Sequence, residues 1–190
     1  MEITAAFLFL FNFVVIGTKC ADFQCDVTYA LKITSSVSGC EDFKNDFMDC
    51  TDLILGTEKG DVGNIAKLGG KVVTAADISC DFDCEVDIWK VLDMGNEYMY
   101  NMKVNFGSSL KDTDAPWYPV LKNLNITECP VPSNVFEMAE LELSLDCVKD
   151  VLTHEFCGDY RIQFCFIDVT DKISCHTLDI CIFEVEADDC

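Results

Sequence analysis

The sequence predicts an all-β protein, a sandwich of two packed sheets, and three observations support this fold class. Several short stretches alternate strictly between apolar and polar residues. Glycine, proline, asparagine and aspartate punctuate the chain between these stretches. Helical periodicity is nearly absent. With 190 residues, of which 50% are hydrophobic, the chain is long enough for one domain with a sizeable core.

The central predicted strand spans residues 98–106. Its apolar positions are Tyr98, Tyr100, Met102, Val104 and Phe106, and polar residues and Met99 lie between them. The dipeptide Gly95-Asn96 signals a turn before this strand. Residues 84–92 are rich in β-forming residues and predict the preceding strand.

The C-terminal part predicts three further strands. Residues 139–145 alternate leucine with glutamate and serine, and residues 160–166 place Tyr160, Ile162, Phe164 and Phe166 on one face. A hairpin turn at 168–172 then leads into a returning strand at 173–185. Antiparallel pairing about this turn places Cys165 roughly opposite Cys175.

The N-terminal part is less regular. Residues 27–33 alternate and predict a strand, and residues 35–39 predict a turn. Residues 41–55 predict a short helix, with Phe43, Phe47 and Met48 at helical spacing. Glycines at 56, 60, 63, 69 and 70 predict a loop-rich boundary, and residues 72–78 predict a short strand after it.

Residues 107–121 contain a polar loop followed by an apolar segment between two prolines. The segment reads Pro-Trp-Tyr-Pro-Val-Leu from Pro116 to Leu121. Because proline cannot donate a ladder hydrogen bond, we expect this segment to lie outside the middle of a sheet.

Charge and cysteine content restrict the functional class. A formal net charge of -21 argues against binding nucleic acid or anionic lipid surfaces. Residues 1–20 resemble a secretory signal, with cleavage after Gly17 or after Cys20. Cleavage after Cys20 would reduce the 13 cysteines to an even 12, which suits a disulfide framework in an oxidising compartment. Asn125 begins a glycosylation sequon, Asn-Ile-Thr.

Catalytic and metal-binding motifs are poorly represented. Histidine occurs only at 154 and 176, and neither a Gly-x-Ser-x-Gly elbow nor a His-Glu-x-x-His motif is present. Acidic residues at 81, 83, 85 and 87 resemble a calcium loop, but Val86 replaces the glycine that an EF-hand requires. We therefore expect no enzyme, no metal site and no cofactor.

Taken together, residues 60–186 resemble the ML-domain family of lipid-recognition proteins. The resemblance rests on the Cys80/Cys84 loop, Gly95, and the Val104-Asn105-Phe106 end of a long alternating strand. It continues through the proline-flanked segment 116–121, Cys129-Pro130, and the hairpin from Tyr160 to Cys175. The chain departs from the family in its additional cysteines and its long N-terminal segment. The cysteine that would pair with Cys175 is missing near residues 61–65, so Cys50 or another cysteine would have to serve.

The resemblance implies a secreted or lysosomal lipid carrier with an immunoglobulin-like β-sandwich and an internal apolar cavity. With the signal peptide at 1–20, we expect a cysteine-containing N-terminal extension at 21–59 and a lipid-recognition domain at 60–187. The resemblance implies a disulfide between Cys80 and Cys84. It also implies a hydrophobic lipid as the partner, transient contact with a membrane or receptor, and a monomer. The candidate lipid-binding residues are Tyr98, Tyr100, Met102, Phe106, Trp117, Tyr118, Pro119, Val120, Ile162, Phe164 and Phe166. The alternative is a secreted cysteine-rich interaction protein, a ligand, inhibitor or effector with a filled core and no lipid.

Overall fold

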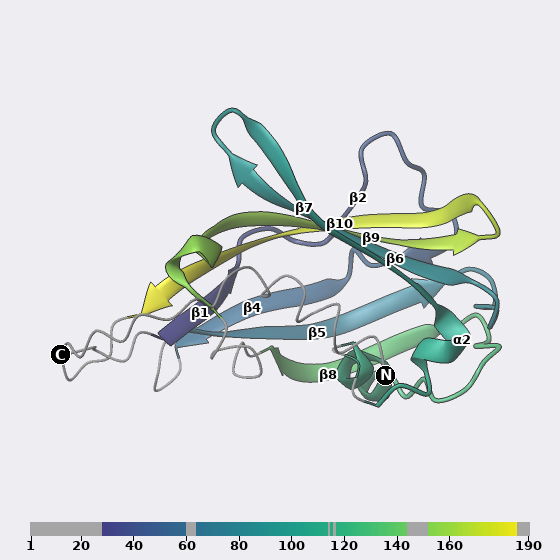
Figure 1. Ribbon diagram of the computed structural model, residues 1–190. Helices are drawn as coiled ribbons and strands as arrows, with labels where there is room; N and C mark the ends of the chain where they lie inside the picture. The colour runs from purple at the N-terminus through teal and green to yellow at the C-terminus, as the bar shows by residue number, and fades with distance from the viewer. Residues whose placement is uncertain (1–27, 60–63, 114, 116, 144–151, 186–190) are drawn as a thin grey trace.

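The computed structural model describes residues 28–59, 64–113, 115, 117–143 and 152–185. Two antiparallel sheets pack face to face, which confirms the predicted all-β sandwich (Figure 1). The first sheet has the order β1 (Thr28–Ile33), β10 (Asp171–Val185), β9 (Gly158–Asp168), β6 (Asp83–Leu92) and β7 (Gly95–Asn105), with β2 (Ser38–Gly39) also paired to β10. The second sheet contains β3 (Met48–Asp49), β4 (Leu53–Lys59), β5 (Asn64–Thr74) and β8 (Val135–Leu143).

Two short helices, α2 (Phe106–Ser109) and α3 (Tyr118–Asn123), lie outside the sheets, and a 3₁₀ turn, η1 (His154–Phe156), precedes β9. The helix α2 directly continues β7, and Asn105 caps it by accepting a hydrogen bond from the Ser108 N–H. The segment between the prolines forms α3 with Pro119 in its first turn, where a missing N–H costs nothing. No helix in the described ranges is long and apolar enough to cross a membrane.

The C-terminal hairpin forms where the alternation predicts it. The strands β9 and β10 pair through a tight turn, and Cys175 lies directly opposite Cys165 as expected. The strands β6, β7 and β8 likewise confirm the strands predicted within 84–106 and 139–145, with bounds shifted by a few residues. Residues 144 and 145 lie outside the described residues.

The predicted helix over 41–55 is wrong. The chain instead forms β3 and β4, which pair with successive parts of β5. In β4 the side chains of Leu53 and Leu55 are half-buried, whereas Ile54 between them is 70% exposed. Sheet pairing in the folded protein therefore overrides a weak local helical spacing. The predicted turn at 35–39 also ends in the short strand β2 rather than in irregular chain.

The glycine-rich stretch is not a boundary. Gly56 lies within β4, and Gly69 and Gly70 lie within β5. At Gly70 the backbone adopts a positive φ of 98°, and a β-carbon there would collide with the backbone at Asp52. Because β1 to β4 pair with β10 and β5, the described residues 28–59 belong to the same sandwich as the rest and form no separate extension. Gly60 and Gly63 lie outside the described residues.

A β-bulge interrupts the alternation of β7. The residue opposite Ile88 is Tyr100, but the residue opposite Trp89 is Tyr98, so Met99 is the additional residue. One extra residue moves every side chain beyond it to the other face of the sheet. Tyr98 accordingly lies on the outer face, where its ring packs edge-on against Trp89 at 6.0 Å and its hydroxyl donates to Asp87.

The described residues contain two disulfides, and neither joins Cys80 to Cys84. Cys80 pairs with Cys129, and Cys40 pairs with Cys175. The first pairing follows from the bridge between Ile78 and Val131, which brings the two flanking cysteines to a Cα–Cα distance of 5.3 Å. Cys84 lies on β6, lines the cavity between the sheets and is unpaired. The implied Cys80–Cys84 disulfide is therefore wrong, and Cys175 pairs with Cys40 rather than Cys50.

Candidate functional site: an apolar cavity between the sheets

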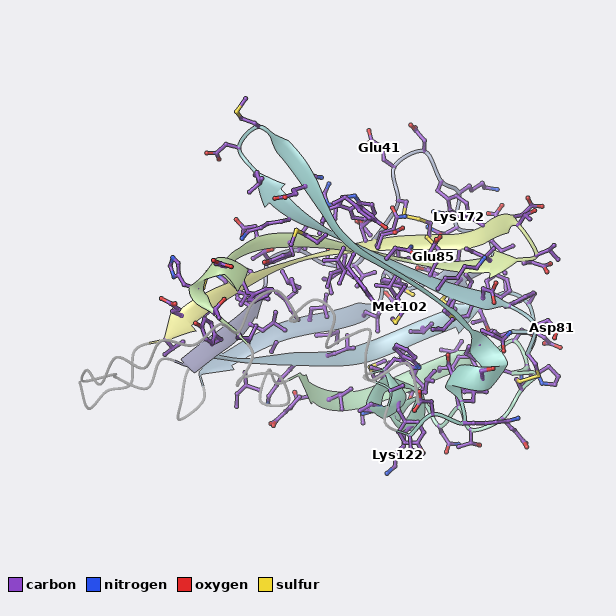
Figure 2. All side chains as sticks on the ribbon, viewed as in Figure 1. Glu41, Asp81, Glu85, Met102, Lys122 and Lys172 are labelled. Carbon is purple, nitrogen blue, oxygen red and sulfur yellow. A yellow bond between two sulfur atoms is a disulfide. The ribbon has the colours of Figure 1, made fainter. Side chains whose placement is uncertain are left out.

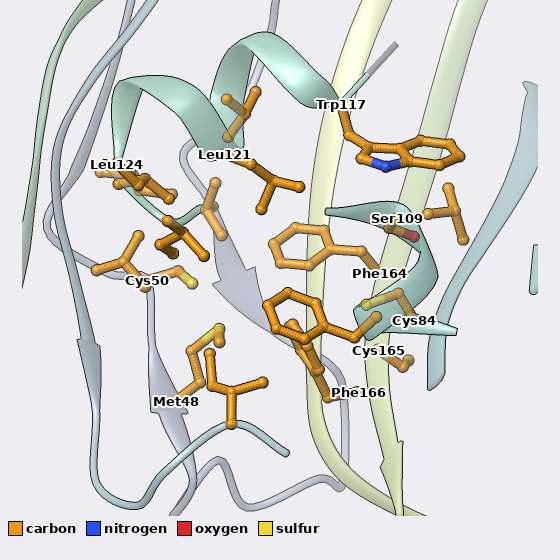
Figure 3. Close-up of a pocket in the computed structure, with 18 of the residues that line it drawn as sticks. Met48, Cys50, Cys84, Ser109, Trp117, Leu121, Leu124, Phe164, Cys165 and Phe166 are labelled. Atoms are coloured by element: carbon orange, nitrogen blue, oxygen red, sulfur yellow. The ribbon is translucent and has the colours of Figure 1, made fainter. Parts of the chain in front are cut away.

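The two sheets enclose a cavity of about 340 Å³ (Figure 3). The first sheet lines it with side chains from four strands, Cys84, Val86, Met102, Val104, Phe164, Phe166 and Leu178. The second sheet contributes mainly aliphatic side chains, Met48, Leu53, Leu55, Leu68, Val72, Phe136 and Met138. The helical end adds Phe106, Ser109, Trp117, Val120, Leu121, Leu124 and Ile126. Figure 2 shows Met102 between the two sheets.

Aromatic rings form a rigid wall along one side of the cavity. Phe166 contacts Phe106 at 5.7 Å and Phe47 at 6.2 Å between ring centroids, and Phe47 in turn packs edge-on against Phe82 at 5.8 Å. Phe164 stacks on His176, whose side chain is almost completely buried. Aromatic pairs of this kind contribute beyond their buried area and fix ring positions. Phe164 and Phe166 of this group line the cavity on the side of β9.

The helix α3 closes one end of the cavity. Val120, Leu121 and Leu124 recur at helical spacing and all face the interior. Trp117 precedes the helix and also lines the cavity. The helix α3 lies beside β8 of the second sheet.

Polar groups around the cavity are few, and most have partners. Thr74 exchanges hydrogen bonds with the backbone of Asn134, and the Ser109 hydroxyl donates to the Asn105 carbonyl at 3.0 Å. The indole N–H of Trp117 is buried and has no partner. Glu85 is also among the lining residues, and its carboxylate pairs with Lys172 at 3.8 Å and accepts a hydrogen bond from Asn101. Among the described residues, no lysine, arginine or histidine side chain lines the cavity.

Three unpaired cysteines line the cavity, Cys50, Cys84 and Cys165. Burial raises the pKa of Cys50 to about 12, and the neighbouring Asp49 adds to this effect. Burial likewise raises the pKa of Cys84 to about 12, with a smaller contribution from Asp83. Burial also raises the pKa of Cys165. All three side chains are therefore neutral thiols at physiological pH and behave as small apolar groups.

Six of the candidate residues line the cavity, Met102, Phe106, Trp117, Val120, Phe164 and Phe166. Five do not, Tyr98, Tyr100, Tyr118, Pro119 and Ile162. The bulge at Met99 turns Tyr98 outward, where it is 57% exposed. Tyr100 and Ile162 both pair with Ile88, farther along the first sheet. In α3 the inward positions are Val120 and Leu121, so Pro119 is exposed and Tyr118 lies beside the cavity rather than on it.

Sequence reasoning missed the wall formed by the second sheet. Leu53 and Leu55 alternate with exposed Ile54, and Leu68 and Val72 are four positions apart on β5. The alternation at 53–55 is a usable signal, but it is too short to outweigh the helical spacing of the preceding aromatic residues. The sequence analysis missed Leu121 and Leu124 because it placed the proline-flanked segment outside the sheets without predicting the helix that orients them.

The acidic residues of β6 have structural partners. Asp83 pairs with Lys103 at 3.2 Å, and Asp87 accepts a hydrogen bond from Asn101 at 2.8 Å. They therefore lie on the outer face of the sheet and are paired there. Across the described residues, possible metal ligands gather in one group, His154, Cys157 and Glu184, in which His154 Nδ1 lies 3.0 Å from Glu184 Oε1. Asn125 is exposed in the turn after α3, a position that a glycan could occupy, and its glycosylation stays a prediction.

Comparisons with known proteins add little. No family model and no curated protein matches the chain. Among solved structures, the chain is similar to a Niemann-Pick type C2 protein from the Japanese carpenter ant. The similarity has a TM-score of 0.41 and 14% sequence identity, and it covers 76% of this chain and 97% of that chain. We base no argument on a similarity of this strength.

Proposed function

We propose that the protein is a secreted lipid-binding protein of the ML-domain type, which holds one lipid between its two sheets and catalyses no reaction. The observation that carries the proposal is the apolar cavity of about 340 Å³ between the sheets. Ligand sites in proteins commonly have volumes of about 300–1,000 Å³ and apolar walls. Ordinary cores are packed without voids of this size.

Burial of a hydrocarbon in this cavity supplies the binding energy. Each 100 Å² of apolar lipid surface that leaves water contributes roughly 2.5 kcal/mol. Lost translational and rotational freedom opposes this term, and the ligand must gain enough contact to exceed it. A cavity that is already formed, with walls fixed by aromatic contacts such as that between Phe106 and Phe166, keeps the ordering cost low.

The rival function, a cysteine-rich interaction protein without a ligand, requires a filled core. The cavity reaches from Met48 at one side to Trp117 at the other, which supports the carrier over the rival. The two disulfides suit an oxidising compartment, so we place the protein outside the cell or in the lysosomal lumen. We further propose that it acts as a monomer and meets membranes or a receptor only transiently.

The test compares two methionines on the same strand. Met102→Asp introduces a carboxylate into the cavity, where an unpaired charge is strongly unfavourable. Met99→Asp makes the same change at the bulge residue, which is likewise half-buried but does not line the cavity. We expect Met102→Asp to abolish binding of a fluorescent sterol or fatty-acid probe, and Met99→Asp to bind like the unmodified protein. Equal binding by both folded variants would contradict a site between the sheets.

A further inference from the structure

The cavity restricts the polar group that a ligand can carry. Among its lining side chains, the Trp117 indole is the one N–H or O–H donor that has no partner in the described part of the chain. In Figure 3 the indole nitrogen lies on the edge of the ring that faces Ser109 and Phe164. A buried donor without a partner costs free energy, and a ligand oxygen that accepts from it recovers that cost.

Ser109 supplies the complementary group. Its hydroxyl donates to the Asn105 carbonyl, so the hydroxyl hydrogen is used, whereas the oxygen still has lone pairs that can accept. Ser109 is itself buried at the capped end of the cavity, and both side chains line it. The capped end therefore offers one N–H donor and one oxygen acceptor to a bound molecule.

An ionised carboxylate matches this pair poorly. It can accept from Trp117, but it has no hydrogen to donate to Ser109, and the lining offers no cationic side chain to balance its charge. The formal net charge of -21 adds long-range repulsion. Transfer of an unpaired carboxylate into an apolar site is much more costly than transfer of a hydroxyl.

From these contacts we infer that the cavity selects neutral lipids that carry a single hydroxyl group, with the hydroxyl oxygen accepting from Trp117 Nε1 and its hydrogen donated to Ser109 Oγ. A hydroxyl is both donor and acceptor, so it satisfies both side chains at once. The hydrocarbon part then occupies the apolar walls. Long-chain alcohols and sterols have this chemistry, whereas alkanes lack the polar group and fatty acids are charged at neutral pH. The inference rests on the proposed lipid-binding function.

The test uses three lipids with the same chain, dodecanol, dodecanoate and dodecane, in competition with bound N-phenylnaphthylamine at neutral pH. Two neutral hydrogen bonds correspond to about a tenfold preference for dodecanol over dodecane. We expect dodecanoate to bind more weakly than dodecanol. Dodecanoate binding as tightly as dodecanol, or no preference among the three, would overturn the inference while leaving the carrier function intact.

A pair of tryptophan variants locates the donor. Trp117→Phe keeps an aromatic ring and removes the N–H, so the preference for dodecanol over dodecane should fall severalfold. Trp89→Phe makes the same change on the outer face beside Tyr98 and should leave the preference unchanged. An unchanged preference in folded Trp117→Phe would remove Trp117 from the recognition. Failure of all three lipids to bind the unmodified protein would contradict the proposed function itself.

Discussion

The sulfur of Cys165 lies 3.2 Å from the sulfur of Cys175, although Cys175 is already bonded to Cys40. The backbone explains this proximity. The Cys175 N–H donates to the Asn45 side chain and its carbonyl accepts from Cys40, so both groups point away from β9. Cys165 and Cys175 therefore form a non-hydrogen-bonded pair, the kind in which opposite side chains approach most closely.

Removal of Cys40 should create a new disulfide. In Cys40→Ser, Cys175 and Cys165 become two thiols on directly opposite strands, and we expect them to oxidise to a cross-strand disulfide in the secreted protein. Peptide mapping without reduction, after acid trapping, identifies the pair. The control Cys165→Ala should retain the Cys40–Cys175 disulfide. Free Cys165 and Cys175 in oxidised Cys40→Ser would contradict the close placement of the two sulfurs.

The Asn45 side chain should stabilise the fold, because it makes the two backbone hydrogen bonds to Cys175 that a neighbouring strand would otherwise make. Its side chain accepts from the Cys175 N–H and donates to the Cys175 carbonyl, each at 2.7 Å. Asn45→Ala leaves the buried Cys175 N–H without this partner, and we expect it to lower the free energy of unfolding by about 2 kcal/mol. Urea denaturation measures the change. Lys44→Ala alters an exposed neighbour and should change stability by less than about 0.5 kcal/mol.

The buried histidine should make the fold sensitive to mild acid. Burial lowers the pKa of His176 below its ordinary value of 6.5, although Asp49 and the Met48 backbone oppose this. Below about pH 6.5 the unfolded chain therefore binds more protons at His176 than the folded chain does. The contribution of His176 to the free energy of unfolding is complete above that pH and is lost as the pH falls. One histidine changes the slope of the free energy of unfolding against pH by at most about 1.4 kcal/mol per pH unit.

The variant His176→Phe separates this effect from the titration of the carboxylates. Urea denaturation between neutral pH and mild acid should show a smaller dependence on pH in His176→Phe than in the unmodified protein. His154→Gln, at the exposed histidine, should keep the full dependence. Parallel stability profiles for the unmodified protein and His176→Phe would rule out His176 as the acid-sensitive group.

Two of the thiols that line the cavity, Cys50 and Cys84, should resist alkylation. Because the pKa of Cys50 and of Cys84 is about 12 rather than the ordinary 9.0, their thiolate fraction is lower by about three orders of magnitude. We expect iodoacetamide at weakly alkaline pH to spare both residues in the folded protein and to modify them in urea. Mass spectrometry of tryptic peptides gives the rates. Rapid labelling of folded Cys84 would show that the cavity admits water freely.

Strands with one buried and one exposed face could be predicted from the sequence, because apolar and polar residues then alternate along the chain. The strands β9 and β10 and their register at Cys165 and Cys175 are examples. It could not reveal the bulge at Met99, since Tyr98 and Tyr100 fit an uninterrupted strand equally well and only pairing with Ile88 and Trp89 separates them. Of the two candidate residues, Met102 therefore lines the cavity and Tyr98 does not.

Contacts between segments far apart in the sequence could not be predicted either. The partners of Cys80 and Cys175 depend on how distant segments meet, and 49 and 135 residues separate the bonded cysteines. The second sheet also depends on distant segments, because β3 and β4 form by pairing with β5. Local residue spacing alone favoured a helix in this part of the chain. The cavity itself is a property of two sheets and a helix at once. An apolar face predicts burial, and only the packed structure distinguishes a filled core from an enclosed space.

The most direct test of the central claim, that the cavity holds a lipid, is native mass spectrometry of the protein secreted from eukaryotic cells, followed by extraction and identification of any bound lipid. We predict a species with one lipid molecule per chain, and a neutral hydroxylated lipid in the extract. A bare polypeptide mass, persisting after incubation with mixed lipids, would contradict the lipid-carrier account and favour the interaction protein with no ligand.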